Sequence, residues 1–150
     1  MVEVYRDIGA SVGEIFTVLA DGWTYASWVV GASHMRDVDP DWPQLGARLH
    51  HRVGPWPISL DDTTTVVAVE QDRLLELDAH AWPAGAARIR LTLKPLGLDR
   101  TRVRLAEAFS SPLARHIPER AQAVLLVPRN RESLARLDDL AVHRVRGRQR

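Results

Sequence analysis

The chain has 150 residues, of which 45% are hydrophobic; this length suits one domain with a core of its own and leaves no room for a second. Lys and Arg number 20 against 19 for Asp and Glu, so the formal charge of +1 excludes a general electrostatic attraction to nucleic acid or acidic lipid. The absence of cysteine excludes disulfides, thiolate chemistry and cysteine-ligated zinc.

The N-terminal part is predicted to form one strand and two short helices. Polar and apolar residues alternate over Val2–Ile8, which is typical of a half-buried strand. Ser11 and Glu14 have the spacing of a capping box, and apolar residues then recur at helical spacing until an Asp-Gly pair ends the helix. Residues 23–30 indicate a second short helix, in which Trp28 is too large to remain exposed and is expected to pack under the edge of a sheet.

Six further strands are expected after the helices, because clusters of turn-forming residues separate segments with an alternating pattern. These strands are predicted at residues 33–37, 47–53, 60–69, 74–81, 86–94 and 102–109.

The C-terminal part is expected to contain one long helix, residues 128–143. Pro128 then lies in the first turn, where a helix tolerates proline. Leu134 and Leu137 belong to an apolar stripe that needs a partner surface, and the sheet is the only candidate. Residues 111–126 carry two prolines and are expected to form an irregular or short helical connection.

Strand registers indicate which side chains share the inner face of the sheet. Pairing the two strands around the turn at residues 83–85 places Leu77 opposite Leu91. The alternation continues into the last strand and carries Glu107 inward, opposite Ile89. An acidic residue is therefore expected on an otherwise apolar face.

Polar side chains from the earlier strands are expected on the same face. The apolar residues of the strand 47–53 take His51 inward with them, and a two-residue turn at 71–72 places Asp62, Thr64 and Ala68 inside. His51 could then face Asp62. Because an unpaired buried charge costs several kcal/mol, these groups must pair with one another or line a wet cavity, and His51 is the cation expected near Glu107.

Each of these polar residues also has a purely structural interpretation. Glu107 could form a salt bridge at the rim of the sheet, His51 could be a hydrogen-bonded structural group, and the inward position of Asp62 could belong to its neighbour. Trp42 and Trp56 lie in Pro-rich loops, where they could either pack a loop or rim an entrance.

Four segments carry a resemblance that covers nearly the whole chain: ASVGEIFTVLADGWTYASWV (10–29), GARLHHRVGPWP (46–57), ARIRLTLKPLGLDRTRVRLAE (87–107) and RNRESLARLDDLA (129–141). They resemble the START-like or polyketide cyclase/dehydrase superfamily, which has the helix-grip fold of the birch-pollen-allergen type. The resemblance implies an α+β fold in which a curved antiparallel sheet of six or seven strands wraps around the long C-terminal helix, with two short helices after the first strand. Residues 1–143 then form a single ligand-binding domain, and residues 144–150 form a basic, frayed tail.

The resemblance also implies a deep apolar cavity between the sheet and the final helix, but it matches no catalytic motif of the superfamily. Together with the expected inner face, it predicts that the cavity is lined by Trp28, Leu49, His51, Trp56, Asp62, Thr64, Leu77, Ala79, Ile89, Leu91, Leu105, Glu107, Phe109 and Leu134. If the protein is an enzyme, Glu107, His51 and Asp62 are the candidates for catalysis. No cofactor is expected, and no metal, because His50 and His51 point to opposite faces of their strand.

The sequence is compatible with three functions. The first is the binding or carriage of a small hydrophobic molecule, lipid-like or polyketide-like, by burial of apolar surface with one or two polar groups fixing its orientation. The second is a polyketide aromatase/cyclase or dehydratase, in which His51 or Glu107 transfers protons. The third is an interaction or stress-regulatory domain without a small-molecule ligand.

The expected location in the cell follows from signals that the sequence lacks. The first residues show neither the basic nor the apolar region of a secretory signal, and no apolar run is long enough to span a bilayer. We therefore expect a cytoplasmic monomer or homodimer that binds no nucleic acid and does not insert into membranes.

Overall fold

The computed structural model describes the chain except for residues 33, 54–59, 82–84 and 113. Within the described residues the strands are β1 (Val2–Ile8), β2 (His34–Val38), β3 (Arg48–Val53), β4 (Leu60–Glu70), β5 (Leu74–Ala81), β6 (Gly85–Gly97) and β7 (Arg100–Phe109). The helices are α1 (Val12–Leu19), α2 (Tyr25–Trp28) and α3 (Glu119–Arg148), with short 3-10 turns η1 (Gly22–Thr24) and η2 (Ala114–His116).

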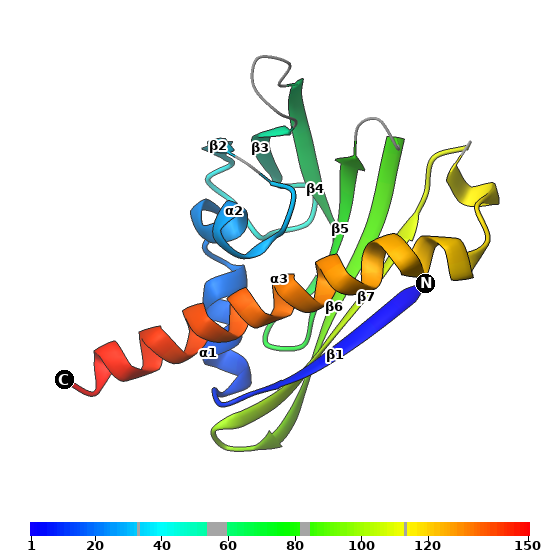
Figure 1. Ribbon diagram of the computed structural model, residues 1–150. Helices are drawn as coiled ribbons and strands as arrows, with labels where there is room; N and C mark the ends of the chain where they lie inside the picture. The colour runs from blue at the N-terminus through cyan, green and yellow to red at the C-terminus, as the bar shows by residue number, and fades with distance from the viewer. Residues whose placement is uncertain (33, 54–59, 82–84, 113) are drawn as a thin grey trace.

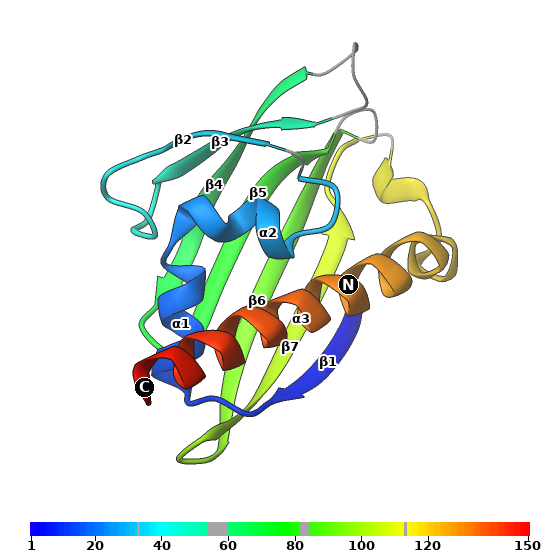
Figure 2. The same ribbon diagram turned by 60° about the vertical axis from the view of Figure 1, so that its left-hand side comes forward.

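The seven described strands form one antiparallel sheet in the order β1-β7-β6-β5-β4-β3-β2. The sheet curves around α3, which crosses its concave face (Figure 1). Figure 2 shows α1 and α2 beside α3 over the same face. This arrangement confirms the predicted α+β helix-grip fold.

The capping box of α1 forms as predicted. The Ser11 Oγ accepts a hydrogen bond from the Glu14 backbone N–H at 3.2 Å, and the Glu14 carboxylate accepts one from the Ser11 N–H at 2.8 Å. The helix then buries Ile15, Phe16 and Leu19 in the core. The second helix is shorter than the expected 23–30.

The register between β6 and β7 also agrees with the prediction, since Ile89 lies opposite Glu107. Between β5 and β6 the register differs by two residues: Leu77 pairs with Ile89 instead of Leu91. The two strands stay paired as far as Gly85, whose φ of +95° favours glycine. A shift of two residues keeps every side chain on its own face. The residues predicted on the inner face of these two strands therefore stay the same.

A bulge in β4 changes one part of that inner face. Val66 lies opposite Leu77 and is buried, but the register shifts directly after it. Ala68 therefore lies opposite Glu76 on the outer face, and the prediction that it points inward is wrong. An added residue in one strand reverses the alternation beyond it, and the period-2 pattern alone does not reveal this.

The final helix is longer than predicted at both ends. It begins at Glu119, so Pro128 lies inside it and not in its first turn, and the second half of the expected connection 111–126 belongs to the helix. Gln122 fixes this early part, because its side chain accepts a hydrogen bond from the Phe109 N–H and donates one to the Ile117 carbonyl. The expected frayed tail is also wrong, since the helix continues to Arg148.

Candidate functional site

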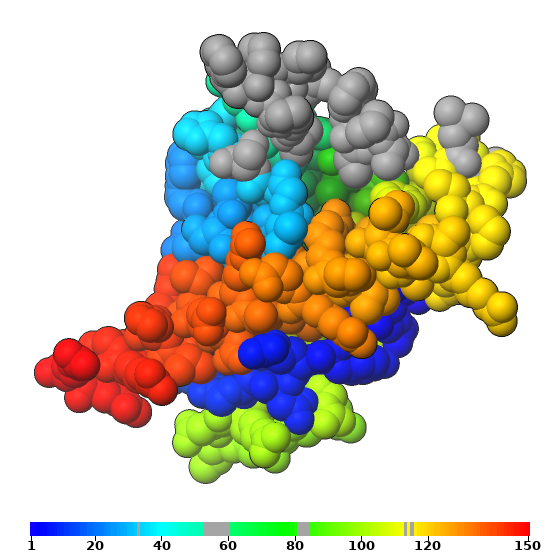
Figure 3. Space-filling view, viewed as in Figure 1, coloured from blue at the N-terminus to red at the C-terminus, as the bar shows by residue number. Residues whose placement is uncertain are grey.

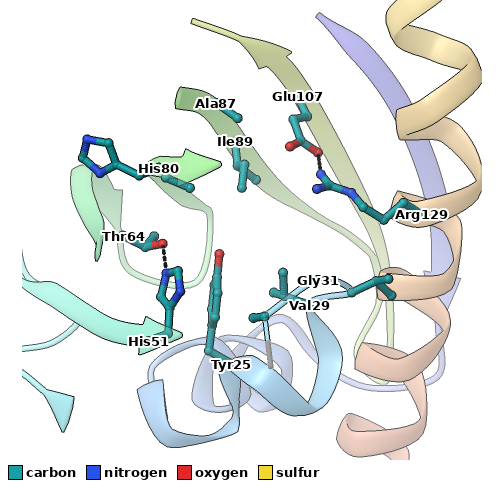
Figure 4. Close-up of a pocket in the computed structure, with 13 residues that line it drawn as sticks. Tyr25, Val29, Gly31, His51, Thr64, His80, Ala87, Ile89, Glu107 and Arg129 are labelled. Atoms are coloured by element: carbon teal, nitrogen blue, oxygen red, sulfur yellow. Dashed lines mark hydrogen bonds and ion pairs between the residues drawn. The ribbon is translucent and has the colours of Figure 1, made fainter. Parts of the chain in front are cut away.

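A cavity of about 220 Å³ lies between α3 and the concave face of the sheet. Its walls come from strands β3 to β7, from the segment 29–32 that follows α2, and from α3 (Figure 4). In the space-filling view the green strands are recessed between α3, in orange, and the segment after α2, in light blue (Figure 3). The cavity thus occupies the position in which helix and sheet grip the interior.

Small side chains leave this space open. Ala79 on β5 and Ala87 on β6 lie directly opposite each other, and both are buried against the cavity. Gly31 and Ala32 line the wall across from the sheet. Larger side chains in place of Ala79 or Ala87 would project into the cavity, because the pleat directs both positions to the inner face.

One group of polar side chains lies on the β3 and β4 side of the cavity. The His51 ring is buried, its Nε2 is 2.8 Å from the Thr64 Oγ1, and its face is stacked on Tyr25 with ring centroids 6.0 Å apart. Burial lowers the pKa of His51 below its usual value, and the Asp62 carboxylate opposes this shift. Burial also raises the pKa of Tyr25 to about 12, against a hydrogen bond with Thr64. Both rings are therefore uncharged at neutral pH.

A second polar group lies across the cavity, where β7 faces α3. The Glu107 side chain is 2% exposed and accepts a charge-assisted hydrogen bond from the Arg129 guanidinium (Figure 4). The expectation that His51 supplies the cation for Glu107 is therefore wrong. Arg129 is the partner because it shares a helix face with Ser133 and Leu137, four and eight residues later.

Asn130 extends this second group. Its Oδ1 accepts hydrogen bonds from the Arg129 Nη2 at 3.1 Å and Nε at 3.3 Å, and the residue is 2% exposed. The positive charge of Arg129 balances the negative charge of Glu107, and the rings of His51 and Tyr25 add none. The two polar groups, Glu107 with Arg129 on one side and His51 with Tyr25 on the other, thus carry no net charge at neutral pH.

The structure brings many of the predicted cavity residues together. Five of them line the cavity: His51, Thr64, Ala79, Ile89 and Glu107. Three others line a smaller adjoining recess: Trp28, Leu77 and Leu105.

The other predicted cavity residues lie elsewhere. Leu49, Leu91 and Leu134 are buried in the core and are not part of the cavity wall in the described residues. Phe109 is half-buried near the end of β7 and also does not line it. Trp56 lies outside the described residues.

Asp62 faces His51 across the β3–β4 pair, as expected, but does not line the cavity. Its Oδ1 accepts a hydrogen bond from the Thr63 N–H at 2.8 Å and lies 3.6 Å from the His80 Nδ1. These contacts hold the carboxylate near the rim, where His80 lines the cavity and is exposed.

In the part of the chain that the structure describes, no three His, Asp or Glu side chains gather as a metal site would require. None of the described helices is long and apolar enough to cross a membrane.

Comparison with known proteins gives one match at the level of the sequence family. The family described as "Polyketide cyclase / dehydrase and lipid transport" matches residues 1–142. No curated protein sequence matches the chain significantly.

Solved structures share the fold at low sequence identity. Protein NE0264 of Nitrosomonas europaea is 15% identical with a TM-score of 0.72, and the alignment covers 95% of this chain and 94% of that one. Norcoclaurine synthase of Thalictrum flavum, a point mutant in complex with a transition-state analogue, is 15% identical with a TM-score of 0.65, covering 95% and 94%. The di-domain ARO/CYC StfQ of the steffimycin biosynthetic pathway is 14% identical with a TM-score of 0.65, covering 94% of this chain and 44% of StfQ.

Proposed function

Because this chain belongs to the polyketide cyclase/dehydrase and lipid-transport family, we propose that it binds a small, largely apolar molecule in the cavity between the sheet and α3. The observation that carries the proposal is the cavity itself: it has apolar walls and two separate groups of buried polar side chains. Such a combination is typical of small-molecule sites, in which apolar walls provide affinity and a few polar groups fix orientation.

The volume of the cavity indicates the size of the ligand. An apolar cavity of about 150 Å³ holds a benzene molecule, so 220 Å³ suits a compact molecule of one or two rings better than a long acyl chain. Burial of about 200 Å² of ring surface contributes roughly 5 kcal/mol at about 25 cal/mol per Å². This corresponds to a dissociation constant somewhat below about 1 mM, and each good hydrogen bond strengthens it further.

The test uses 2-naphthol as a two-ring probe. Isothermal titration calorimetry should show one binding site per chain, and the melting temperature should rise with probe concentration because the probe binds only the folded state. Ala79→Trp should lower the affinity at least tenfold, since the indole would occupy the cavity.

The matched control is Ala108→Trp, which places the same side chain on the outer face of β7, away from the cavity. This variant should bind 2-naphthol as the unmodified protein does. Equal binding by both tryptophan variants would place the probe elsewhere and contradict the proposal.

A second candidate function is proton transfer, and the state of His51 favours it. The His51 Nδ1 is buried and has no hydrogen-bond partner among the described residues, while Nε2 is held by Thr64. The lowered pKa keeps the ring neutral at pH 7, which is the form that accepts a proton. Norcoclaurine synthase and StfQ, whose names denote a synthase and an aromatase/cyclase, share this fold.

A general-base probe separates catalysis from binding. 5-Nitrobenzisoxazole is an uncharged two-ring compound whose ring opens when a base removes its C–H proton and the N–O bond breaks. A catalytic His51 should accelerate this reaction, and His51→Gln should lower kcat/KM by about 10² or more while leaving KM nearly unchanged. Equal rates for both proteins would leave ligand binding as the function.

A further inference from the structure

A small recess continues the cavity toward α3. Its volume is about 10 Å³, and it shares Tyr25, Ile89, Glu107 and Arg129 with the cavity wall. A space of this size holds about one oxygen atom of a water molecule or of a ligand. The recess is therefore suited to one polar atom of a molecule whose rings lie in the main cavity.

Asn130 lines this recess, and its side chain carries a hydrogen-bond donor without a partner in the described residues. The orientation of its amide is determined by Arg129, because a guanidinium has only donors and both contacts must go to the amide oxygen. The amide nitrogen Nδ2 is consequently the atom left over, and it is buried without a hydrogen-bond partner in the described residues. A buried donor in this state gains most from an acceptor oxygen.

Ser133 lies one helical turn after Asn130 and lines the same recess. Its Oγ accepts a hydrogen bond from the Val30 N–H at 3.0 Å. The hydroxyl hydrogen has no acceptor among the described residues, so it is a second donor available to the recess. Two donors on neighbouring turns of one helix form a cradle for a single acceptor oxygen.

The charges around the recess select against an anion. Arg129 is already engaged by Glu107 and Asn130, and the buried Glu107 carboxylate would repel a second carboxylate. A carboxylate also carries two oxygens, whereas the recess has room for about one.

We infer that the ligand is an uncharged molecule that places one acceptor oxygen, such as a ketone carbonyl, in the recess between Asn130 and Ser133. This inference rests on the proposed function, because it assumes that the cavity binds a ligand. It makes Asn130 the residue that determines specificity, since its Nδ2 donates to that oxygen.

Three probes of equal ring structure test the inference by isothermal titration calorimetry. Indane has no oxygen, 1-indanone adds one uncharged carbonyl, and indane-2-carboxylate adds a negative charge. We expect 1-indanone to bind at least tenfold more tightly than indane, and the carboxylate to bind more weakly than either.

The variants assign this preference to the recess. In Asn130→Leu the donor is replaced by an apolar group, so 1-indanone and indane should bind equally, with indane retaining at least its original affinity. Asn130→Ala also loses the donor and introduces a residue that favours a helix, so it serves as a second variant. Ser133→Ala should reduce the ratio of the two affinities by a smaller factor.

The outcomes distinguish the two proposals. If none of the three probes binds, the proposed function itself fails. If indane and 1-indanone bind the unmodified protein equally, or if the Asn130 variants keep the preference for 1-indanone, the cavity binds ligands but this inference is wrong. Tighter binding of the carboxylate would also overturn it.

Discussion

The two ends of the space between α3 and the sheet differ in how they are filled. At the end near α1, large apolar side chains close the space completely: Phe16 and Leu19 from α1 and Leu137 from α3 are all buried in one cluster. At the other end, the facing residues are small or polar, and a cavity of about 220 Å³ remains. The same helix and sheet therefore form a packed core at one end and a cavity at the other.

The comparison shows that side-chain size and pairing, not backbone arrangement, decide where this fold opens. Ala79 and Ala87 remove the bulk that Leu75 and Leu91 supply farther along the same pair of strands. Charged side chains can be buried at the open end because they are paired, as Glu107 is with Arg129. The packed end contributes stability, and we expect the open end to contribute recognition.

The largest expected effect belongs to the packed end. Leu137→Ala should lower the free energy of unfolding by about 3–4 kcal/mol, because the side chain is fully buried and its removal leaves a cavity. Urea unfolding monitored by tryptophan fluorescence measures the change.

Leu125→Ala is the control, since this leucine on the same helix is 65% exposed and its loss should cost less than about 0.5 kcal/mol. Similar losses for the two variants would show that α3 does not pack as the structure indicates.

An intermediate effect is expected where the polar groups of the open end pair. Arg129→Leu should cost about 2–3 kcal/mol, because it leaves the buried Glu107 carboxylate without a cation. Glu107→Gln should cost only about 1 kcal/mol, because the remaining Arg129 is one-third exposed and can be solvated, and the amide oxygen still accepts a hydrogen bond. The same unfolding experiment compares them. A larger loss for Glu107→Gln than for Arg129→Leu would contradict the burial of the carboxylate.

The packed end could be predicted from sequence because its signals are periodic. The capping box at Ser11 and Glu14, and the apolar stripe with Leu134 and Leu137, follow rules that involve neighbours within one turn or two. Strand alternation likewise placed the inner face correctly, except beyond the bulge after Val66. The predicted start of α3 is wrong because Pro112 and Pro118 suggested an irregular connection and Pro128 suggested a first turn. Pro118 in fact lies just before the helix, and Pro128 is accommodated within it.

The open end could be predicted only in part, because its groups meet across long distances in the chain. Alternation carried His51, Thr64 and Glu107 to the inner face, but it did not show which cation meets Glu107. Arg129 belongs to another element, and its contact depends on the depth at which α3 lies in the sheet. Arg129 in turn determines the orientation of the Asn130 amide, because it donates to the amide oxygen and leaves the amide nitrogen without a partner. The helical spacing of Arg129, Ser133 and Leu137 is the signal that could have identified this group.

The smallest effect we predict is a pH dependence of the melting temperature that arises from His51 at the open end. Burial lowers the pKa of His51 in the folded protein below the value of about 6.5 expected for the unfolded chain. As the pH falls through about 6.5, His51 therefore becomes protonated in the unfolded chain before it does so in the folded protein. The free energy of unfolding then decreases progressively until the pH reaches the lower pKa of the folded protein. The melting temperature should fall more between pH 7.5 and 5.5 for the unmodified protein than for His51→Gln, in which this proton uptake is absent.

Differential scanning fluorimetry at the two pH values measures this difference, because the other titratable groups contribute equally to both proteins. An equal fall for the unmodified protein and His51→Gln would mean that the His51 ring is already solvated at the open end. The buried hydrogen bond to Thr64 would then not hold in solution, and the contrast between a packed end and an open end with an ordered polar wall would fail at that residue.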